Sequence, residues 1–230
     1  MRILGKTSTE GYNATVWEDS TGRCFMIGDL DVDADGANGQ NGKLAAYRVR
    51  NDGSEDLVNG GMAWRGGKVV GVQDWWKDIV YEKDGQPFVL PNGVVPSKTA
   101  YTLDPKGRPE DQLDSETIPY IVLPPFCVTG VKGIVKGCRA LASYKKKRVE
   151  CVVGDIGPRT KVGEGSIELC RQLGIRSSPR NGGLETPEVI YEWWPGQFGT
   201  VHGTLIPLMS ASGKHIYPSD NDKSRTARSD

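Results

Sequence analysis

The sequence predicts a mainly β (α+β) fold built around a barrel, with few short helices. Short runs of β-branched and aromatic residues recur along the chain, and turn-forming clusters such as Asn51-Asp52-Gly53 and Pro91-Asn92-Gly93 separate them. The 30 glycines and 14 prolines favour many turns over long helices. Strands of this kind indicate an antiparallel or mixed β-barrel rather than an alternating β/α sheet.

The strand signals are spread over most of the chain. The predicted strands are 15–18, 24–27 continuing to 33, 44–49, 68–72, 87–90, 99–103, 120–123, 133–135, 139–143, 149–153, 189–193 and 204–208. A helix is predicted over residues 166–173, where Ser166 can cap the first turn and Gly174 suits a left-handed stop. The pattern of residues 73–82 fits either a helix or a strand.

A chain of 230 residues can bury one large core, with room for a small accessory lobe formed by insertions. Residues 1–15 are polar and predict an N-terminal arm, extended or paired as an edge strand. Residues 16–212 carry the predicted domain. Residues 213–230 are polar and charged, which predicts a flexible tail.

Charge argues against several classes of partner. Lys+Arg and Asp+Glu balance at 29 each, so a general field for nucleic acid is absent and no nucleic acid partner is expected. The basic run Lys145-Lys146-Lys147-Arg148 is predicted to be a solvated hairpin turn. No apolar run approaches 18 residues, so no membrane span is expected. We expect a monomer.

The first residues, Met1-Arg2-Ile3-Leu4-Gly5-Lys6, lack the apolar stretch of a secretory signal. We expect that the chain stays where it is made, is released by lysis, or is shown without its leader. Five cysteines without a CxxC pair argue against zinc. Reduced, buried thiols are favoured over a Cys138–Cys151 disulfide. Neither a metal nor a cofactor is predicted.

Asp155 and Glu164 are the most informative residues. They stand nine positions apart, with Gly154, Gly163 and Gly165 beside them, between an apolar run and the predicted helix. Glycosidic bond cleavage needs such a pair, one carboxyl protonated and the other ionised. The alternative interpretation makes Asp155 a turn residue and Glu164 a carboxylate favoured by the helix dipole.

Four aspartates, Asp29, Asp31, Asp33 and Asp35, alternate with Leu30, Val32 and Ala34. In a strand this period places the apolar set in the core and all four carboxylates on the other face. Like charges so arranged repel one another unless a cation lies near them. A calcium loop of the EF-hand type is disfavoured, since Gly42 stands where its glutamate belongs. A solvated strand end and another kind of calcium site remain alternatives.

Four stretches in order resemble the endo-chitosanases of glycoside hydrolase family 75. They are Asp29-Leu30-Asp31-Val32-Asp33-Ala34-Asp35-Gly36, Pro96-Ser97-Lys98-Thr99-Ala100-Tyr101, Leu113-Asp114-Ser115 with Ile118-Pro119-Tyr120-Ile121-Val122-Leu123-Pro124, and Val153-Gly154-Asp155-Ile156-Gly157-Pro158 with Gly163-Glu164-Gly165-Ser166-Ile167. The resemblance covers roughly residues 25–196. Many relatives carry a cysteine where this chain has Ala34, and most are secreted.

The resemblance implies a double-psi-type β-barrel and hydrolysis of β-1,4 bonds in chitosan with inversion, Asp155 and Glu164 being the essential pair. We assign Glu164 as general acid and Asp155 as general base. The residues expected to bind substrate are Asp29, Asp31, Asp33, Asp35, Thr99, Tyr101, Asp114 and Tyr120. One or two aromatic residues are expected to stack on sugar rings.

Two other functions remain open. A peptidoglycan-cleaving enzyme on the same type of barrel is one, although the aspartates suit an anionic wall polymer poorly. A non-catalytic carbohydrate-binding module is the other, but it would gain nothing from the glycine-flanked carboxylate pair.

Overall fold

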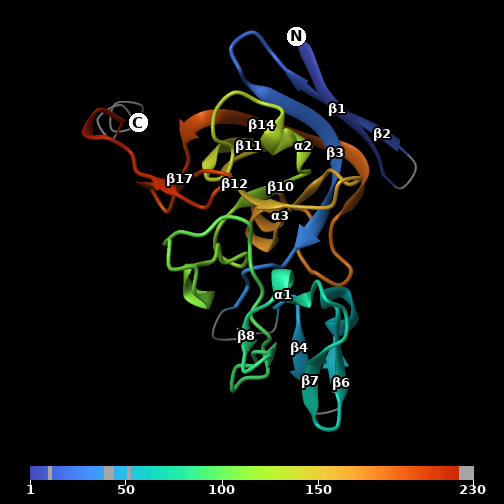
Figure 1. Ribbon diagram of the computed structural model, residues 1–230. Helices are drawn as coiled ribbons and strands as arrows, with labels where there is room; N and C mark the ends of the chain where they lie inside the picture. Colours follow the sequence, from blue (N-terminus) through green and yellow to red (C-terminus); the bar gives the residue numbers. More distant parts are fainter. Residues whose placement is uncertain (10–11, 39–43, 51–52, 223–230) are drawn as a thin grey trace.

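The computed structural model describes residues 1–9, 12–38, 44–50 and 53–222. Strands take up 44% of it and helices 12%, so the molecule is mainly β. A closed six-stranded barrel forms the upper part of the view in Figure 1, and a smaller lobe lies below it. The predicted β-barrel with few short helices is confirmed.

Six strands close the barrel. They are β3 (Cys24–Asp33), β13 (Glu164–Ser166), β10 (Tyr120–Leu123), β12 (Lys147–Ile156), β11 (Cys138–Tyr144) and β14 (Leu184–Phe198), in that spatial order. Pairing of β14 with β3 completes the ring. The β3–β13 and β10–β12 pairs are parallel and the other four are antiparallel, so the barrel is mixed.

Alternate residues of each strand fill the barrel. Ile121 and Leu123 of β10 belong to the main core, together with Leu30 and Val153. The other residues of β10, Tyr120 and Val122, belong to a second apolar cluster. Strand β10 is therefore buried on both faces, which explains its uninterrupted apolar sequence. Burial of each such side chain contributes about 1.5–3 kcal/mol.

The N-terminal segment extends the barrel sheet. Strand β1 (Arg2–Thr9) forms a hairpin with β2 (Tyr12–Glu18), and β2 pairs with the start of β3. The predicted arm is thus an edge strand within a hairpin. Helix α2 (Phe126–Thr129) follows β10 and contacts β1.

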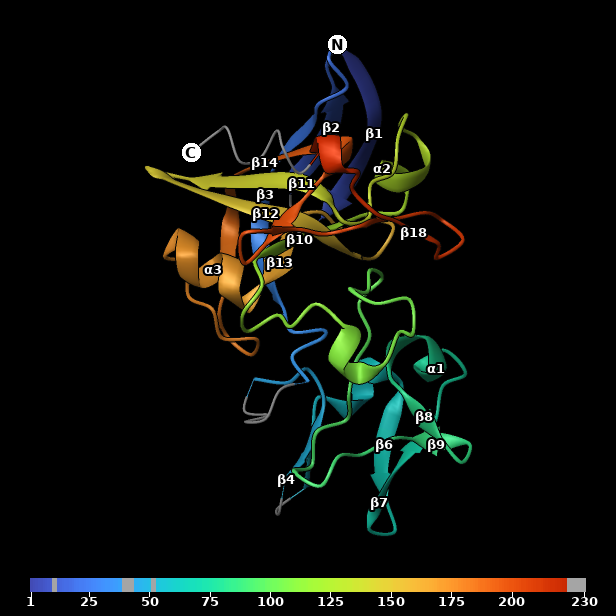
Figure 2. The same ribbon diagram turned by 90° about the vertical axis from the view of Figure 1, so that its left-hand side faces the viewer.

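The lobe comes from the chain between β3 and β10 and has its own core around Tyr47, Met62 and Trp76. Its elements are β4 (Arg48–Arg50), β5 (Gly53–Glu55), η1 (Leu57–Gly60), β6 (Met62–Arg65), β7 (Lys68–Gly71), α1 (Trp76–Ile79), β8 (Glu82–Lys83) and β9 (Gln86–Pro87). Short helix α1 answers the open question about residues 73–82. Figure 2 shows the lobe as a separate layer below the barrel, and η2 (Pro109–Asp111) lies on the return path.

Helix α3 (Ile167–Leu173) forms as predicted. The Ser166 hydroxyl accepts a hydrogen bond from the Leu169 N–H at 3.1 Å, and Gly174 ends the helix with φ 75°. The same Ser166 hydroxyl accepts from the Tyr120 N–H at 3.0 Å. One serine therefore both caps α3 and joins its start to β10.

The predicted tail boundary at residue 213 is wrong. Strand β17 (Leu208–Met209) pairs with β18 (His215–Ile216), after the small hairpin of β15 (Thr200–Val201) and β16 (Thr204–Leu205). His215 is buried, and its Nε2 lies 2.6 Å from the Thr102 carbonyl oxygen. Sequence polarity misses this contact because hydrogen bonding, rather than apolar patterning, holds the segment. Residues 223–230 lie outside the described chain.

All five cysteines are buried free thiols, as favoured from the sequence, and no Cys138–Cys151 disulfide forms. Among the described residues, none of the helices has the length and apolar character needed to span a membrane.

A buried serine joins the aspartate strand to α3. The Ser115 hydroxyl donates to the Asp33 carbonyl oxygen at 2.5 Å and accepts from the Ile167 N–H at 2.9 Å. We expect Ser115→Ala to lower the free energy of unfolding by about 1–3 kcal/mol, because two buried backbone groups lose their partner. Urea unfolding measures this. Exposed Ser20 provides the control, and Ser20→Ala should change stability by less than about 0.5 kcal/mol.

Candidate active site

Strand register brings Asp155 and Glu164 to the two sides of one residue. Val122 of β10 pairs with Asp155 of β12 on one side and with Glu164 of β13 on the other. Laterally paired residues point to the same face of a sheet, and neighbouring strands are about 4.8 Å apart. The two Cα atoms are therefore separated by two strand spacings, about 9–10 Å.

The row continues onto the aspartate strand. Glu164 pairs in parallel register with Asp31, and Ser166 pairs with Asp33. The outer face of the barrel thus carries a carboxylate row, defined here as Asp155, Glu164, Asp31 and Asp33, with Asp35 just beyond the end of β3. Both catalytic candidates are thus held by strands, Asp155 by β12 and Glu164 by β13.

The Glu164 carboxyl extends across Val122 toward β12. A Cβ added at Gly157 would lie 3.0 Å from Glu164 Oε2 and 3.1 Å from Val122 Cγ1. Glycine at position 157 therefore leaves the space that this carboxyl occupies.

Two backbone N–H groups hold the carboxylate of Asp155. The N–H groups of Ala100 and Ile156 each donate to Asp155 Oδ1 at 2.7 Å. Hydrogen bonds to the charged form favour ionisation. The Asp155 side chain is thus fixed in one orientation, with its second oxygen Oδ2 unused by either donor.

Asp33 is held equally firmly. Its Oδ1 accepts from the Asp35 N–H at 2.8 Å, and its Oδ2 lies 3.0 Å from the Tyr120 hydroxyl. The Tyr120 hydroxyl also donates to the Asp35 carbonyl oxygen at 2.8 Å. Tyr120 therefore joins β10 to the turn that follows β3.

The pKa values of these carboxyls are raised. Burial, followed by the charge of Asp33, raises the pKa of Glu164 from 4.5 to about 8, while Lys161 opposes the shift. Burial and the charge of Asp33 also raise the pKa of Asp155 well above its usual range, against its two N–H donors. Asp35 has a raised pKa for the same reasons. Glu164 therefore keeps its proton at neutral pH, and the same causes disfavour the charged forms of Asp155 and Asp35.

The loop before β13 supplies a cation. Lys161 Nζ forms an ion pair with Asp31 Oδ2, and both side chains are about one-third exposed. The next residues turn sharply, since Gly163 has φ 86° and a Cβ there would collide with Asp29 Oδ1. The Asp31 N–H donates to the Gly163 carbonyl oxygen at 2.8 Å, so the end of the loop is fixed against β3.

The lobe closes over the other end of the row through residues 96–101. The Ser97 hydroxyl accepts from the Gly36 N–H at 3.1 Å, and the following Ala100 N–H reaches Asp155. Burial and the charge of Asp35 raise the pKa of Tyr47, which belongs to the lobe core. The row therefore lies where the barrel meets the lobe.

Three of the residues predicted to contact substrate are buried, and a fourth, Asp114, is partly exposed. Tyr101 is fully buried, with its hydroxyl donating to the Pro207 carbonyl oxygen at 2.8 Å, and Tyr120 is fully buried as described. The Thr99 hydroxyl is buried and donates to the Tyr101 carbonyl oxygen at 2.6 Å. Asp114 accepts from Glu116 N–H and the Thr117 hydroxyl within its own turn. The three buried side chains support the site from behind, and the contact predicted for Asp114 stays a prediction.

The aspartate ladder also differs from its prediction. Leu30 does face the core, but Asp29 and Asp33 are buried and only Asp31 and Asp35 are partly exposed. The period of two identifies the face correctly, yet the loop at Gly163 and Tyr120 cover parts of that face. Gly42, on which the disfavoured EF-hand depends, lies outside the described residues.

Three carboxylate oxygens, from Asp33, Asp35 and Asp155, lie within 4.8 Å of one another. Oxygen ligands at such spacing are those that hard divalent cations use. Shared protons relieve the same repulsion, and the raised pKa values indicate that they do so here. The expectation that no metal binds stays a prediction.

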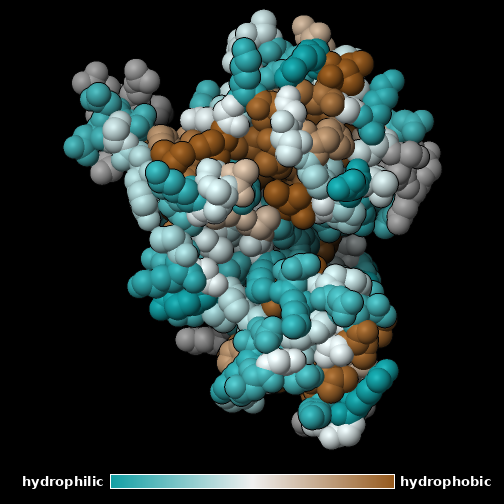
Figure 3. All heavy atoms as spheres, viewed as in Figure 1, coloured by the Kyte–Doolittle hydropathy of each residue, from teal (hydrophilic) through white to brown (hydrophobic). Residues whose placement is uncertain are grey.

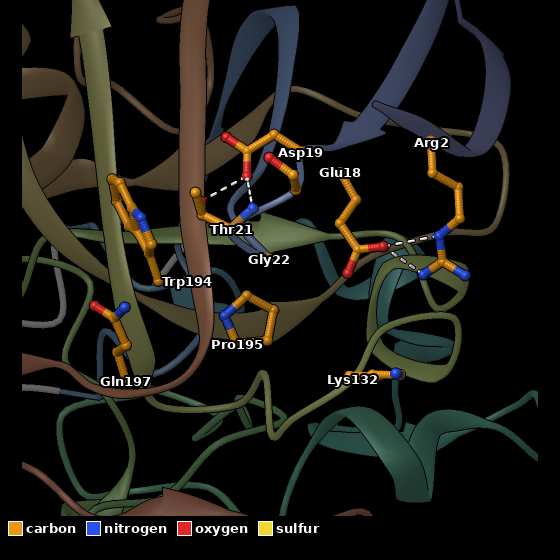
Figure 4. Close-up of a pocket in the computed structure, with 10 residues that line it drawn as sticks. Arg2, Glu18, Asp19, Thr21, Gly22, Lys132, Trp194, Pro195 and Gln197 are labelled. Atoms are coloured by element: carbon orange, nitrogen blue, oxygen red, sulfur yellow. Dashed lines mark hydrogen bonds and ion pairs between the residues drawn. The ribbon is translucent and has the colours of Figure 1, made fainter.

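Two surface cavities lie away from the row. One, of about 540 Å³, lies between Trp194 and the Arg2–Glu18 ion pair (Figure 4). Its Asp19 has a pKa lowered to about 2, chiefly by a hydrogen bond from the Thr21 hydroxyl, and is thus an ordinary ionised surface acid. The other, of about 530 Å³, lies on the lobe beside Trp64 and Phe88. Neither cavity brings an acid with a raised pKa together with an ionised acid.

Aromatic residues offer few sugar platforms. Trp193 and Trp76 are buried, whereas Trp64 and Trp75 are 41% and 44% exposed on the lobe. In the space-filling view, apolar side chains gather over the barrel, and a smaller group lies at the β6–β7 end of the lobe (Figure 3). Trp64 and Trp75 are thus exposed enough to stack on sugar rings, and the expectation of one or two stacking residues stays a prediction.

Sequence reasoning missed Lys161, Gly157 and the N–H of Ala100. A backbone donor leaves no trace in a sequence, but Lys161 is visible as a cation three positions before Glu164. No family model matches the chain, and a search of curated proteins finds no relative.

Because the pKa of Glu164 is higher in the folded state (about 8) than its ordinary 4.5, the folded protein binds more protons between these values. Stability from this group is complete below pH 4.5 and is lost as pH rises toward 8. We expect the melting temperature to fall between pH 5 and pH 8, and to fall less in Glu164→Gln. Thermal unfolding at both pH values measures this, with exposed Glu185→Gln as control. An identical fall in melting temperature in Glu164→Gln and in the Glu185→Gln control would contradict the raised pKa of Glu164.

Proposed function

We propose that the protein is an endo-chitosanase, which hydrolyses β-1,4 bonds of chitosan by inverting acid/base catalysis. The observation that carries this proposal is the pairing of Asp155 and Glu164 on opposite sides of Val122. Inverting enzymes keep their carboxyls about 6.5–9.5 Å apart, whereas retaining enzymes need about 5–5.5 Å. The Cα atoms of Asp155 and Glu164 are two strand spacings apart, and this supports the wider carboxyl separation, which leaves room for a water molecule.

The environments of the two carboxyls support different roles. Glu164, with a pKa near 8, keeps its proton at neutral pH and can donate it to the leaving oxygen. Burial and the charge of Asp33 raise the pKa of Asp155, whereas its two backbone donors on Oδ1 favour the ionised form; once ionised, Asp155 can accept a proton from the attacking water on Oδ2. Water thereby adds to the anomeric carbon while the glycosidic oxygen leaves with the proton from Glu164.

The remaining carboxylates favour a cationic polymer. Asp31, Asp33 and Asp35 lie around the pair; the charge of Asp33 opposes ionisation of both catalytic candidates, and the charge of Asp31 opposes ionisation of Glu164. Ammonium groups of bound glucosamine units would reduce this repulsion, and Asp155 would then ionise more readily. An anionic polymer would increase it. This favours chitosan over peptidoglycan.

We expect Asp155→Asn and Glu164→Gln each to lower kcat on chitosan by about 100-fold or more, the usual contribution of a positioned acid or base. Release of reducing ends from chitosan, chitin and purified peptidoglycan measures activity and substrate class together. Glu150→Gln, on the same strand as Asp155 but outside the row, is the control and should retain activity. Unchanged rates in both row variants would defeat the assignment.

Azide tests the division of roles. It should restore activity to Asp155→Ala, because a small anion can replace a missing base. Recovery at Glu164→Ala instead would reverse the two roles.

A further inference from the structure

An amine already occupies one position in the carboxylate row. Lys161 Nζ pairs with Asp31 Oδ2, and Asp31 is the register partner of Glu164. Adjacent strands are about 4.8 Å apart, so the Lys161 ammonium lies next to the proposed general acid. Its charge lowers the pKa of Glu164, against the effect of burial.

The ion pair between Lys161 and Asp31 can be replaced by another ion pair at little cost in free energy. Both partners are about one-third exposed, and ion pairs of this kind contribute only about 0–1 kcal/mol. The hydrogen bond from Asp31 N–H to the Gly163 carbonyl oxygen holds the end of the loop. The lysine side chain can therefore leave Asp31 while Glu164 stays in place.

The chemistry of the displaced group identifies its replacement. A lysine side chain ends in a primary ammonium with three N–H donors, and so does carbon 2 of a protonated glucosamine. An N-acetylated sugar presents a neutral amide there and cannot compete for a carboxylate with a lysine on equal terms. A carboxylate that already holds one primary ammonium is thus suited to a second.

We propose that Asp31 selects a glucosamine unit beside the cleaved bond, and that Lys161 is an internal competitor which the substrate ammonium displaces. This rests on the chitosanase function proposed above. Lys161 thereby neutralises Asp31 in the free enzyme and makes the site discriminate against acetylated units, which leave the Lys161–Asp31 pair intact.

The test is binding of the glucosamine hexamer and of the N-acetylglucosamine hexamer, by calorimetry, in the Glu164→Gln background. We expect Lys161→Met to tighten binding of the glucosamine hexamer by about two- to fivefold. This is the change in dissociation constant that corresponds to the free energy of one exposed ion pair. Binding of the acetylated hexamer should not tighten. Asp31→Asn should weaken binding of the glucosamine hexamer by about fivefold or more and leave binding of the acetylated hexamer unchanged.

Two further variants separate competition from structural damage. Lys161→Arg keeps a cation and should bind like the parent protein. Lys146→Met removes an exposed lysine from the β11–β12 turn and should change neither affinity. In enzyme with Glu164 intact, Lys161→Met should lower KM for chitosan more than it changes kcat.

Weaker binding of the glucosamine hexamer to Lys161→Met, or equal changes for both hexamers, would overturn the inference. If intact enzyme cleaves chitosan while Lys161→Met does not tighten binding of the glucosamine hexamer, the inference fails and the proposed function stands. If neither hexamer binds and chitosan is not cleaved, the proposed function fails and the inference fails with it.

Discussion

Mutual repulsion among carboxylates on one face of the barrel is the constraint on which this structure depends. Asp155, Glu164 and three aspartates of the β3 segment occupy neighbouring positions, and burial makes their charges more costly. Three things stabilise this group of carboxyls. The barrel register fixes their positions, backbone N–H groups donate hydrogen bonds to some of them, and protons neutralise others. Because the fold raises the pKa of Glu164 in this way, that carboxyl can act as a proton donor at neutral pH.

The parts around the row serve to keep that arrangement. Tyr120 joins β10 to the turn after β3, and Ser115 joins β3 to α3. The lobe contributes little chemistry of its own, but its return segment delivers the Ala100 N–H to Asp155. Gly157 leaves space for the Glu164 carboxyl. The barrel, the lobe and one loop thus converge on two carboxyls.

Local patterns predicted much of this. The Ser166 cap with the Gly174 stop identified α3, alternation placed Leu30 inside, and turn residues marked most strands. These patterns did not predict the burial of a side chain where burial depends on which other segments cover that face of the strand. A period of two cannot show that Asp33 meets Tyr120, that Tyr101 turns into the core, or that Asp29 lies beneath Gly163. Nor can sequence show that Val122 separates the two candidate catalytic residues, because that pairing arises from barrel closure.

The stereochemistry of cleavage tests the central claim most directly, because it reports the separation of the two carboxyls. Proton NMR during the first minutes of glucosamine hexamer hydrolysis distinguishes the anomers of the new reducing end. Two carboxyls on opposite sides of Val122, with water between them, predict that the α-anomer appears first and the β-anomer only through mutarotation. Initial release of the β-anomer would mean direct attack by a carboxylate and would contradict the account.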